Sequence, residues 1–279
     1  MNSKNIKVLD VVVVGTGLAG LNFIDKYLEK KNKIDVISPS FEKDLETNIK
    51  TKIKLLPSQM RGKYNNVRNY YNVNNLEIGS NCKALGSLNF GGLSNYWGLQ
   101  IDSYIKNNEK YLGKRKFNQI AKHLVEFLKK FKLVGSFKIN GRKVYNNDFN
   151  LPNNLNKLNE NAKKFICRKP ILAFSTSKNF NGNLNTVIEE KQKLTAKNFF
   201  KKIKKRDNII FHNYYLEKIK KKSNLIQLTC RDNKSTKKIF TKKIVMACGT
   251  IATTKIIADF LNIKKEVRIK HHPRLLSVF

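Results

Sequence analysis

The first residues with the types and spacing for a specific chemistry lie near the start of the chain, in the stretch DVVVVGTGLAG at residues 10–20. Its glycines follow the pattern G-x-G-x-x-G, which in dinucleotide-binding proteins joins a strand to a helix. The first glycine allows a sharp turn, the second a close approach to a pyrophosphate, and the third close packing of the helix. The helix N-terminus offers N–H groups to the phosphates. The residues predicted to surround the phosphates are Gly15, Gly17, Leu18, Ala19 and Gly20.

The flanking elements favour this interpretation. KVLDVVVV at residues 7–14 is β-branched and nearly continuous, which is typical of a strand covered on both faces. Apolar residues then recur at helical spacing in residues 21–33, and IDVIS at residues 34–38 predicts a second strand. Strand, glycine turn, helix and strand form a βαβ unit. The alternative is an ordinary α/β turn with glycines that bind nothing.

The end of the second strand departs from the usual pattern. Dinucleotide-binding domains usually carry an acidic residue there that binds the ribose hydroxyls. This chain has Ser38 at that place, while Asp35 lies within the strand. We expect the Ser38 hydroxyl to bind a ribose more weakly than a carboxylate would.

A second glycine-rich stretch, GGLSNYWG, lies at residues 91–98. Its paired glycines would let the backbone approach a flat ligand, and its polar side chains would supply hydrogen bonds. The alternative is a glycine-rich surface loop. The candidate ligand contacts in this stretch are Gly91, Gly92, Ser94, Asn95, Trp97 and Gly98.

A third small-residue turn comes late in the chain. From residue 208 the pattern predicts a β-meander, with strands NIIFHNYYLEKI, NLIQLTCRD and KKIF separated by polar turns. A further strand, KIVMA, then ends in ACG at residues 247–249. A helix should follow, with Ile251, Ile256 and Ile257 facing inward. The small residues at this turn would also admit a ligand close to the backbone.

Two helices are predicted in the middle of the chain. One covers residues 117–131, and the other covers residues 185–205, beginning near Asn185 or Thr186. Apolar residues recur at helical spacing in the first, which we interpret as core packing. These residues are Phe117, Ile120, Leu124, Phe127, Leu128 and Phe131.

The chain is strongly basic, with a net charge of +36 from 56 Lys and Arg against 20 Asp and Glu. Nearly all the basic residues are lysines spread over every segment, which indicates a compositional bias rather than a nucleic-acid site. The longest apolar run, at residues 11–24, is shorter than the roughly 20 residues of a membrane span. No CxxC or His spacing predicts a metal site, so we expect reduced thiols in a cytoplasmic protein. The cysteines are Cys82, Cys167, Cys230 and Cys248.

GTGLAG, GGLSNYWG and TKKIVMACGTIATTKII, in this order, resemble the FAD-dependent oxidoreductases of the glucose–methanol–choline type. The resemblance implies that the first motif holds the FAD pyrophosphate and that the second lies near the flavin ring and ribityl chain. The third resembles the return strand shared by flavoproteins with two dinucleotide domains. Further FAD contacts implied by the resemblance lie at Leu216, Ala247 and Gly249.

The resemblance also implies an architecture. We expect an α/β fold in which residues 1–100 and 185–279 form a discontinuous, Rossmann-like FAD-binding domain. Residues 101–184 would form an inserted mixed α+β segment belonging to a substrate or cap region. The implied activity is oxidation of a CH–OH group, on a sugar or other polar alcohol, by hydride transfer to FAD.

The C-terminal region leaves the catalytic residues unassigned. His271-His272-Pro273 resembles the family's His-Pro segment, but the family's catalytic His pair lies further along and has no counterpart before Phe279. A second hypothesis is therefore a truncated or split FAD-binding fragment, inactive alone, with a separate C-terminal chain as its partner. A third is a basic Rossmann-like protein that binds polyanions.

Overall fold

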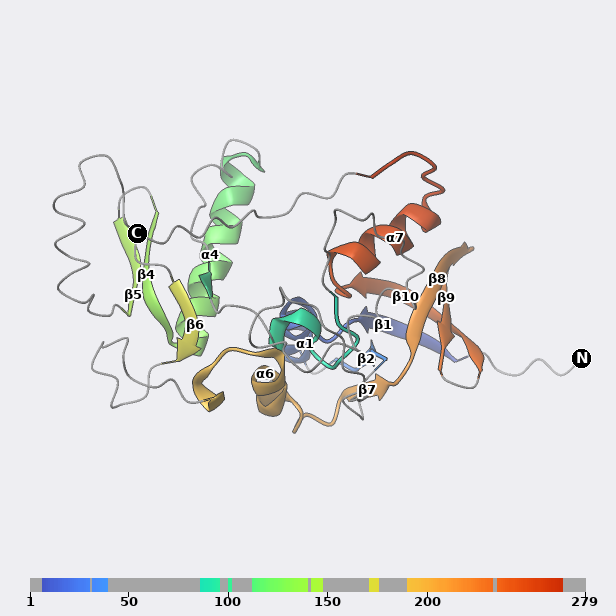
Figure 1. Ribbon diagram of the computed structural model, residues 1–279, viewed down its shortest axis with the longest axis horizontal. Helices are drawn as coiled ribbons and strands as arrows, with labels where there is room; N and C mark the ends of the chain where they lie inside the picture. Colours follow the sequence, from blue (N-terminus) through green and yellow to red (C-terminus); the bar gives the residue numbers. More distant parts are fainter. Residues whose placement is uncertain are drawn as a thin grey trace, which may run out of the picture. The chain divides into compact units, whose positions relative to one another are not determined.

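The computed structural model describes residues 7–30, 32–39, 86–95, 100–101, 112–139, 142–147, 171–175, 190–232 and 235–267. The chain divides into two compact units. One is built from Met1–Tyr96 together with Thr195–Phe279, and the other is Trp97–Leu194. Each unit contains its own sheet (Figure 1).

The first unit is a Rossmann-like α/β structure around a mixed sheet, in the described strand order β7-β2-β1-β10-β9-β8. The four strands β7, β2, β1 and β10 are parallel, whereas β9 and β8 continue the sheet antiparallel. The bounds are β1 Val8–Val14, β2 Ile34–Ile37, β7 Ile209–His212, β8 Tyr215–Lys222, β9 Leu225–Arg231 and β10 Thr236–Met246. The α-helices in the described residues of this unit are α1 Leu18–Leu28, α6 Ala196–Ile203 and α7 Thr250–Phe260.

The central strand β1 is buried on both faces, as its run of valines predicts. Val12 and Val14 pack in one core cluster with Leu216 and Ile219 of β8, so the meander covers this face of the parallel strands. Alternation along the strand directs Val13 to the opposite face, where α1 packs. Val12 and Val13 are both fully buried. The βαβ order of β1, α1 and β2 is therefore confirmed.

The meander differs from the prediction in how its strands are divided. KKIF and KIVMA form a single 11-residue strand, β10, whose first half pairs with β9 and whose second half pairs with β1. Thr241, which lies between the two predicted strands, is fully buried and donates its hydroxyl to Lys243 O. NIIFHNYYLEKI is conversely two strands, because the chain turns after His212, whose carbonyl accepts Tyr214 N–H at 2.9 Å.

Two helix predictions also need correction. The helix predicted to begin near Asn185 begins instead at Ala196, where Thr195 accepts a hydrogen bond from Asn198 N–H at 3.2 Å. A threonine in this capping role ends the preceding extended chain and starts the helix. In α7, Ile256 is buried, but Ile251 and Ile257 are only partly buried.

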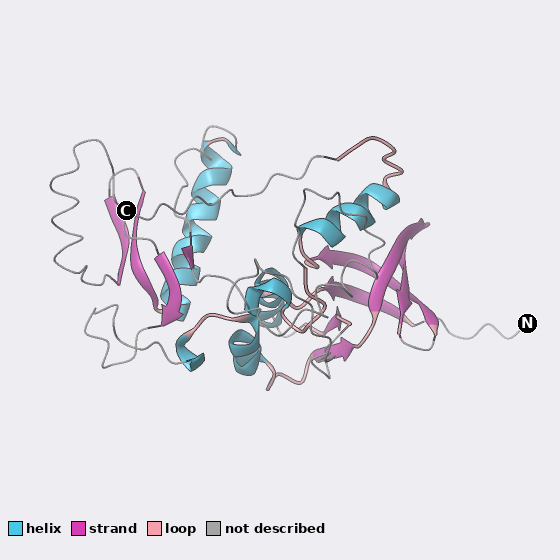
Figure 2. Cartoon of the chain, viewed as in Figure 1, coloured by secondary structure: helices cyan, strands magenta, loops and turns pink. Residues whose placement is uncertain are grey.

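The described part of the second unit contains an antiparallel sheet and one long helix, seen as magenta strands and a cyan helix in Figure 2. The helix α4, Lys114–Phe131, contacts β4 and β5. Most of its predicted core stripe is buried or partly buried, but Ile120 is 48% exposed, so the prediction was wrong for that residue. The strands are β3 Gln100–Ile101, β4 Leu133–Ile139, β5 Arg142–Asn147 and β6 Ile171–Ser175, in the order β3-β6-β4-β5.

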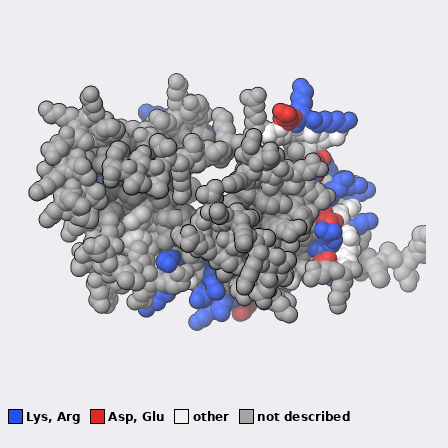
Figure 3. All heavy atoms as spheres, in the orientation of Figure 1, with Lys and Arg blue, Asp and Glu red and all other residues white. Residues whose placement is uncertain are grey.

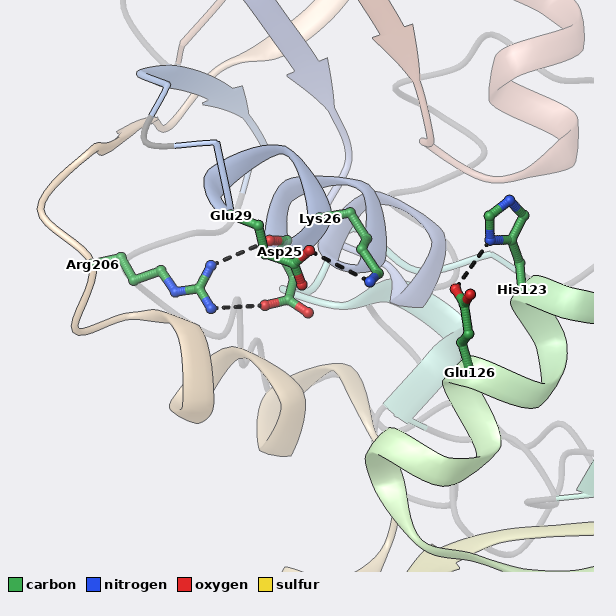
Figure 4. Close-up of polar contacts among 6 residues, drawn as sticks. All are labelled: Asp25, Lys26, Glu29, His123, Glu126 and Arg206. Atoms are coloured by element: carbon green, nitrogen blue, oxygen red, sulfur yellow. Dashed lines mark hydrogen bonds and ion pairs between the residues drawn. The ribbon is translucent and has the colours of Figure 1, made fainter. Parts of the chain in front are cut away.

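An ion pair between buried Asp25 and partly exposed Arg206 joins α1 to the chain after α6 (Figure 4). Asp25 is 2% exposed, and its carboxylate lies 3.2 Å from the Arg206 guanidinium, which also donates to Asp25 O. Arg206→Leu should lower the free energy of unfolding by about 1–3 kcal/mol, because it removes a charged partner from a buried carboxylate. Urea denaturation measures this change.

The matched control is Lys26→Ala on the same helix. Lys26 and Glu29 form an ion pair at 3.4 Å, but both side chains are about half exposed (Figure 4). Exposed pairs of this kind contribute little, so we expect a change within about 0.5 kcal/mol. If Arg206→Leu is no more destabilising than Lys26→Ala, the ion pair between Asp25 and Arg206 does not stabilise the packing of α1.

Candidate dinucleotide-binding site

Three chain segments leave the sheet of the first unit at the same edge. Val14, at the end of β1, pairs with Ile37 of β2 on one side and with Met246 of β10 on the other. Immediately beyond, Gly15 N–H donates to Ile37 O at 2.9 Å and Ala247 N–H donates to Val14 O at 2.8 Å. Ligands of open α/β sheets bind outside the carboxyl ends of the parallel strands, so this edge is the expected site.

The second glycine-rich stretch joins this edge. Gly91 N–H donates to the hydroxyl of Thr16 at 3.0 Å, and the same hydroxyl lies 3.1 Å from that of Ser38. Thr16 and Ser38 are 3% and 2% exposed. The short 3-10 helix η2, Gly92–Asn95, follows directly. The turns around Gly15 and Gly91, distant in sequence, therefore lie side by side.

Two glycines of the first motif are required by the fold itself. Gly15 has φ +103°, and a Cβ there would lie 2.4 Å from Ala247 O. A Cβ on Gly20 would lie 2.3 Å from Gly15 O, so helix α1 could not approach the turn as closely as it does. Both distances are far below van der Waals contact with backbone atoms. These glycines hold the turn, the helix and the end of β10 together.

Gly17 differs from its neighbours in the motif. Its φ of −66° suits any residue, and the nearest atoms to a Cβ there would be Gly91 O at 3.8 Å and Ala247 O at 4.0 Å. Protein packing therefore does not require glycine at this position. Gly17 is also the N-cap of α1, and because glycine has no side chain it makes no capping hydrogen bond to the first N–H groups of the helix. The bare backbone between the three turns fits a diphosphate that approaches a helix N-terminus.

The polar side chains of the second stretch are directed into the turn. The Ser94 hydroxyl donates to Gly91 O, and the Asn95 amide donates to Phe90 O. The Asn95 side-chain oxygen accepts Lys197 N–H of α6 at 3.2 Å. Both side chains therefore shape the backbone around Gly91. The candidates for ligand contact in the turn around Gly91 are therefore its main-chain groups.

The remaining predicted contacts are placed as follows. Leu216 is 3% exposed and packs in the core, so only its backbone could face a ligand. Gly249 is the N-cap of α7, with φ +85° and no atom within 4 Å of a Cβ. Gly92, with φ +55°, begins η2. Trp97 and Gly98 lie outside the described residues.

Two features of this edge were missed in the sequence. Thr16 occupies a variable position of the glycine motif, so its type carried no signal. Asp35 Oδ1 lies 2.7 Å from His212 Nε2, and Asp35 is 6% exposed. The His212 ring stacks on Tyr214 with ring centroids 5.8 Å apart. The backbone carbonyl of His212 accepts Ser38 N–H. The two partners are 177 residues apart, and only the pairing of β2 with β7 brings them together.

The described cysteines have the character of buried thiols. Burial raises the pKa of Cys230 to about 12, and burial likewise raises the pKa of Cys248. Among the residues described, no group of His, Cys, Asp and Glu side chains could hold a metal ion. In the same residues, no helix has both the length and the apolar character needed to cross a membrane.

Basic side chains of the described residues are interspersed with acidic ones on the face shown in Figure 3. Lys242 donates to Asp10 at 2.7 Å and lowers the pKa of that carboxyl group. Arg231 similarly pairs with Glu217 at 3.0 Å. Part of the positive charge is therefore matched locally.

The fold and the edge define the first unit as a Rossmann-like α/β domain. No protein-family model matches the chain. No curated protein is detectably similar to it.

Solved structures show a weak likeness. One is p-nitrophenol 4-monooxygenase PnpA from Pseudomonas putida DLL-E4, with 11% identity and a TM-score of 0.36 over 90% of this chain. Another is a flavoprotein/dehydrogenase from Cytophaga hutchinsonii, with 12% identity and a TM-score of 0.35 over 94% of this chain. This chain spans 44% of the length of each. At these TM-scores the likeness assigns neither family nor function.

Proposed function

We propose that the chain binds FAD at the carboxyl edge of β1, β2 and β10 and belongs to a flavoprotein oxidoreductase. The observation that carries the proposal is the convergence of three turns with little side-chain bulk. Gly91 N–H donates to the hydroxyl of Thr16, the residue between Gly15 and Gly17. Gly15 itself packs against Ala247. One elongated ligand can contact all three, which a set of unrelated glycine loops would not allow.

In this proposal the chain holds FAD mainly through its backbone. The N-terminus of α1, with Leu18 and Ala19 in its first turn, would face the pyrophosphate, because amide groups and the helix dipole favour anions. The turn at Gly91 and the turn at residues 247–249 would border the rest of the cofactor. FAD, when bound, supplies the redox chemistry by accepting a hydride, while the protein orients it.

The finer part of the proposal is the reaction. The order of the three motifs resembles glucose–methanol–choline oxidoreductases, which supports oxidation of a CH–OH group on a sugar or another polar alcohol. A general base would need to lie within hydrogen-bonding reach of that hydroxyl. We assign that role to none of the described residues. His212 bonds to Asp35 where β7 pairs with β2, and His123 lies exposed on α4 of the other unit beside Glu126.

Flavin absorbance tests this proposal. The protein is purified with excess FAD, desalted, and its visible spectrum and flavin content are measured. We expect the yellow spectrum of bound oxidised flavin at close to one FAD per chain. FAD at a hundredfold excess over Kd should also raise the free energy of unfolding by about 2.7 kcal/mol.

A folded but colourless protein, with no stabilisation by FAD, would overturn the proposal. RNA binding that weakens steeply with salt would then favour the polyanion hypothesis. If FAD binds, a panel of sugars and polar alcohols is added without oxygen. Bleaching of the flavin band supports CH–OH oxidation, and an unchanged spectrum with every substrate in the panel counts against it.

A further inference from the structure

We infer that Thr16 is a positioning residue that sets the spacing of the cofactor turns, and that Ser38 supports Thr16 instead of binding a ribose. The inference rests on the proposed FAD site. It concerns a chain of three groups, the Gly91 amide and the hydroxyls of Thr16 and Ser38, which we call the hydroxyl link. This link joins the first turn, the second turn and the end of β2.

The Thr16 hydroxyl has no freedom to bind a ligand. It accepts Gly91 N–H at 3.0 Å and shares a hydrogen bond of 3.1 Å with Ser38, and its residue is 3% exposed. Gly91 is itself buried, so its N–H needs an acceptor inside the protein. The buried Thr16 hydroxyl supplies that acceptor, whereas the neighbouring Gly17 is partly exposed.

The hydroxyl link also fixes the distance between the first turn and the Gly91 turn, between which we place the cofactor. A Cβ at Gly17 would have Gly91 O at 3.8 Å and Ala247 O at 4.0 Å as its nearest atoms, so these two carbonyl groups border the space beside Gly17. Ala247 is tied to β1 through Val14 O, whereas Gly91 is tied to the first turn through Thr16. Loss of the Thr16 hydroxyl would therefore release one wall of this space and leave the other in place.

The supporting role of Ser38 is inferred from the same hydrogen bonds. The sequence alone suggests that it replaces the acid that usually binds a ribose. In the structure it is 2% exposed, its hydroxyl lies against Thr16, and its N–H donates to His212 O at 3.1 Å. A hydroxyl that is buried and already paired is a poor ribose ligand, because turning toward a ligand would break the pair.

A double-mutant cycle with FAD titration tests the inference. Thr16→Val keeps the shape of the side chain but removes the hydroxyl, and it should weaken FAD affinity about tenfold. Thr16→Ser retains the hydroxyl and should bind FAD within about threefold of the wild type. Ser38→Ala should weaken binding less than Thr16→Val. The double variant should be no weaker than Thr16→Val, because both changes act on one link.

Two measurements separate positioning from general stability. Arg206→Leu destabilises the same unit without touching the link, so its FAD affinity, measured well below its unfolding temperature, should equal that of the wild type. Hydrogen exchange at the Gly91 amide, measured without FAD, should accelerate in Thr16→Val and not in Arg206→Leu. The two results together would support a specific role for Thr16, and unchanged exchange at Gly91 in Thr16→Val would contradict it.

The inference fails if Thr16→Val binds FAD as tightly as the wild type. It also fails if Ser38→Ala and Thr16→Val weaken binding additively, because Ser38 would then contact the cofactor independently. Failure of the wild type to bind FAD would instead overturn the proposed function. In that case the Gly91 exchange rate still decides whether the hydroxyl link exists.

Discussion

Gly17→Ser should abolish tight FAD binding while leaving the fold as stable as the wild type. Serine is among the preferred N-cap residues, so the change should maintain or slightly raise the stability of α1. Its Cβ and hydroxyl would nevertheless occupy the space bordered by Gly91 O and Ala247 O, where we place the pyrophosphate. We expect FAD affinity to fall about a hundredfold, equivalent to about 2.7 kcal/mol. Fluorescence titration with FAD measures the affinity.

The control for this variant is Lys26→Ala, which changes an exposed side chain of the same helix. It should leave both the FAD affinity and the unfolding midpoint close to those of the wild type. If Gly17→Ser binds FAD as tightly as Lys26→Ala does, the bare backbone at residue 17 is not a phosphate contact. The first glycine turn would then be purely structural.

Gly20→Ala should have the opposite signature, with a large loss of stability even in the absence of FAD. The added Cβ would lie 2.3 Å from Gly15 O and 3.3 Å from the Ala247 side chain. The closest atom belongs to the backbone, so relief requires moving α1 away from the end of β1. We expect a loss of about 3 kcal/mol, at the upper end of overpacking effects. Urea denaturation of the FAD-free protein measures it.

Gly249→Ala provides the comparison for Gly20→Ala. Gly249 has φ +85°, which strains an alanine, but no atom lies within 4 Å of a Cβ there. The cost should be limited to backbone strain of about 1–3 kcal/mol, because φ +85° with ψ 161° is a conformation found almost only in glycine. Equal stability of the two variants would show that close packing between α1 and the first turn is not what selects glycine at residue 20.

Hydrophobic periodicity was sufficient to predict the main elements of the first unit and the helix α4, but it did not identify the strands β4, β5 and β6. The valine run of β1 and the apolar spacing in α1 and α4 reflect burial that the sequence shows directly. The errors fall where polar residues lie in regular structure. Thr241 is buried inside β10, although its neighbours Lys242 and Lys243 are exposed and suggest a turn. The local sequence pattern cannot reveal that β10 is one long strand, which pairs with β9 on one side and with β1 on the other.

The candidate site was predictable in its backbone but not in its side chains. Glycine spacing predicted turns at the ends of β1 and β10, because only small residues permit such close packing. The spacing could not distinguish Gly20, which the fold requires, from Gly17, which it does not. Ser38 and Asn95 have the chemistry of ligand-binding residues, yet both bond within the protein. That distinction depends on contacts between segments far apart in the chain.

Hydrogen exchange with and without saturating FAD tests the central claim most directly, because it reports on all three turns in one experiment. We predict slower exchange on addition of FAD in three peptides together, covering residues 17–20, 91–95 and 247–250, while exchange in β9 stays unchanged. Protection confined to one of these segments, or spread evenly over the domain, would contradict a single ligand lying across the three turns.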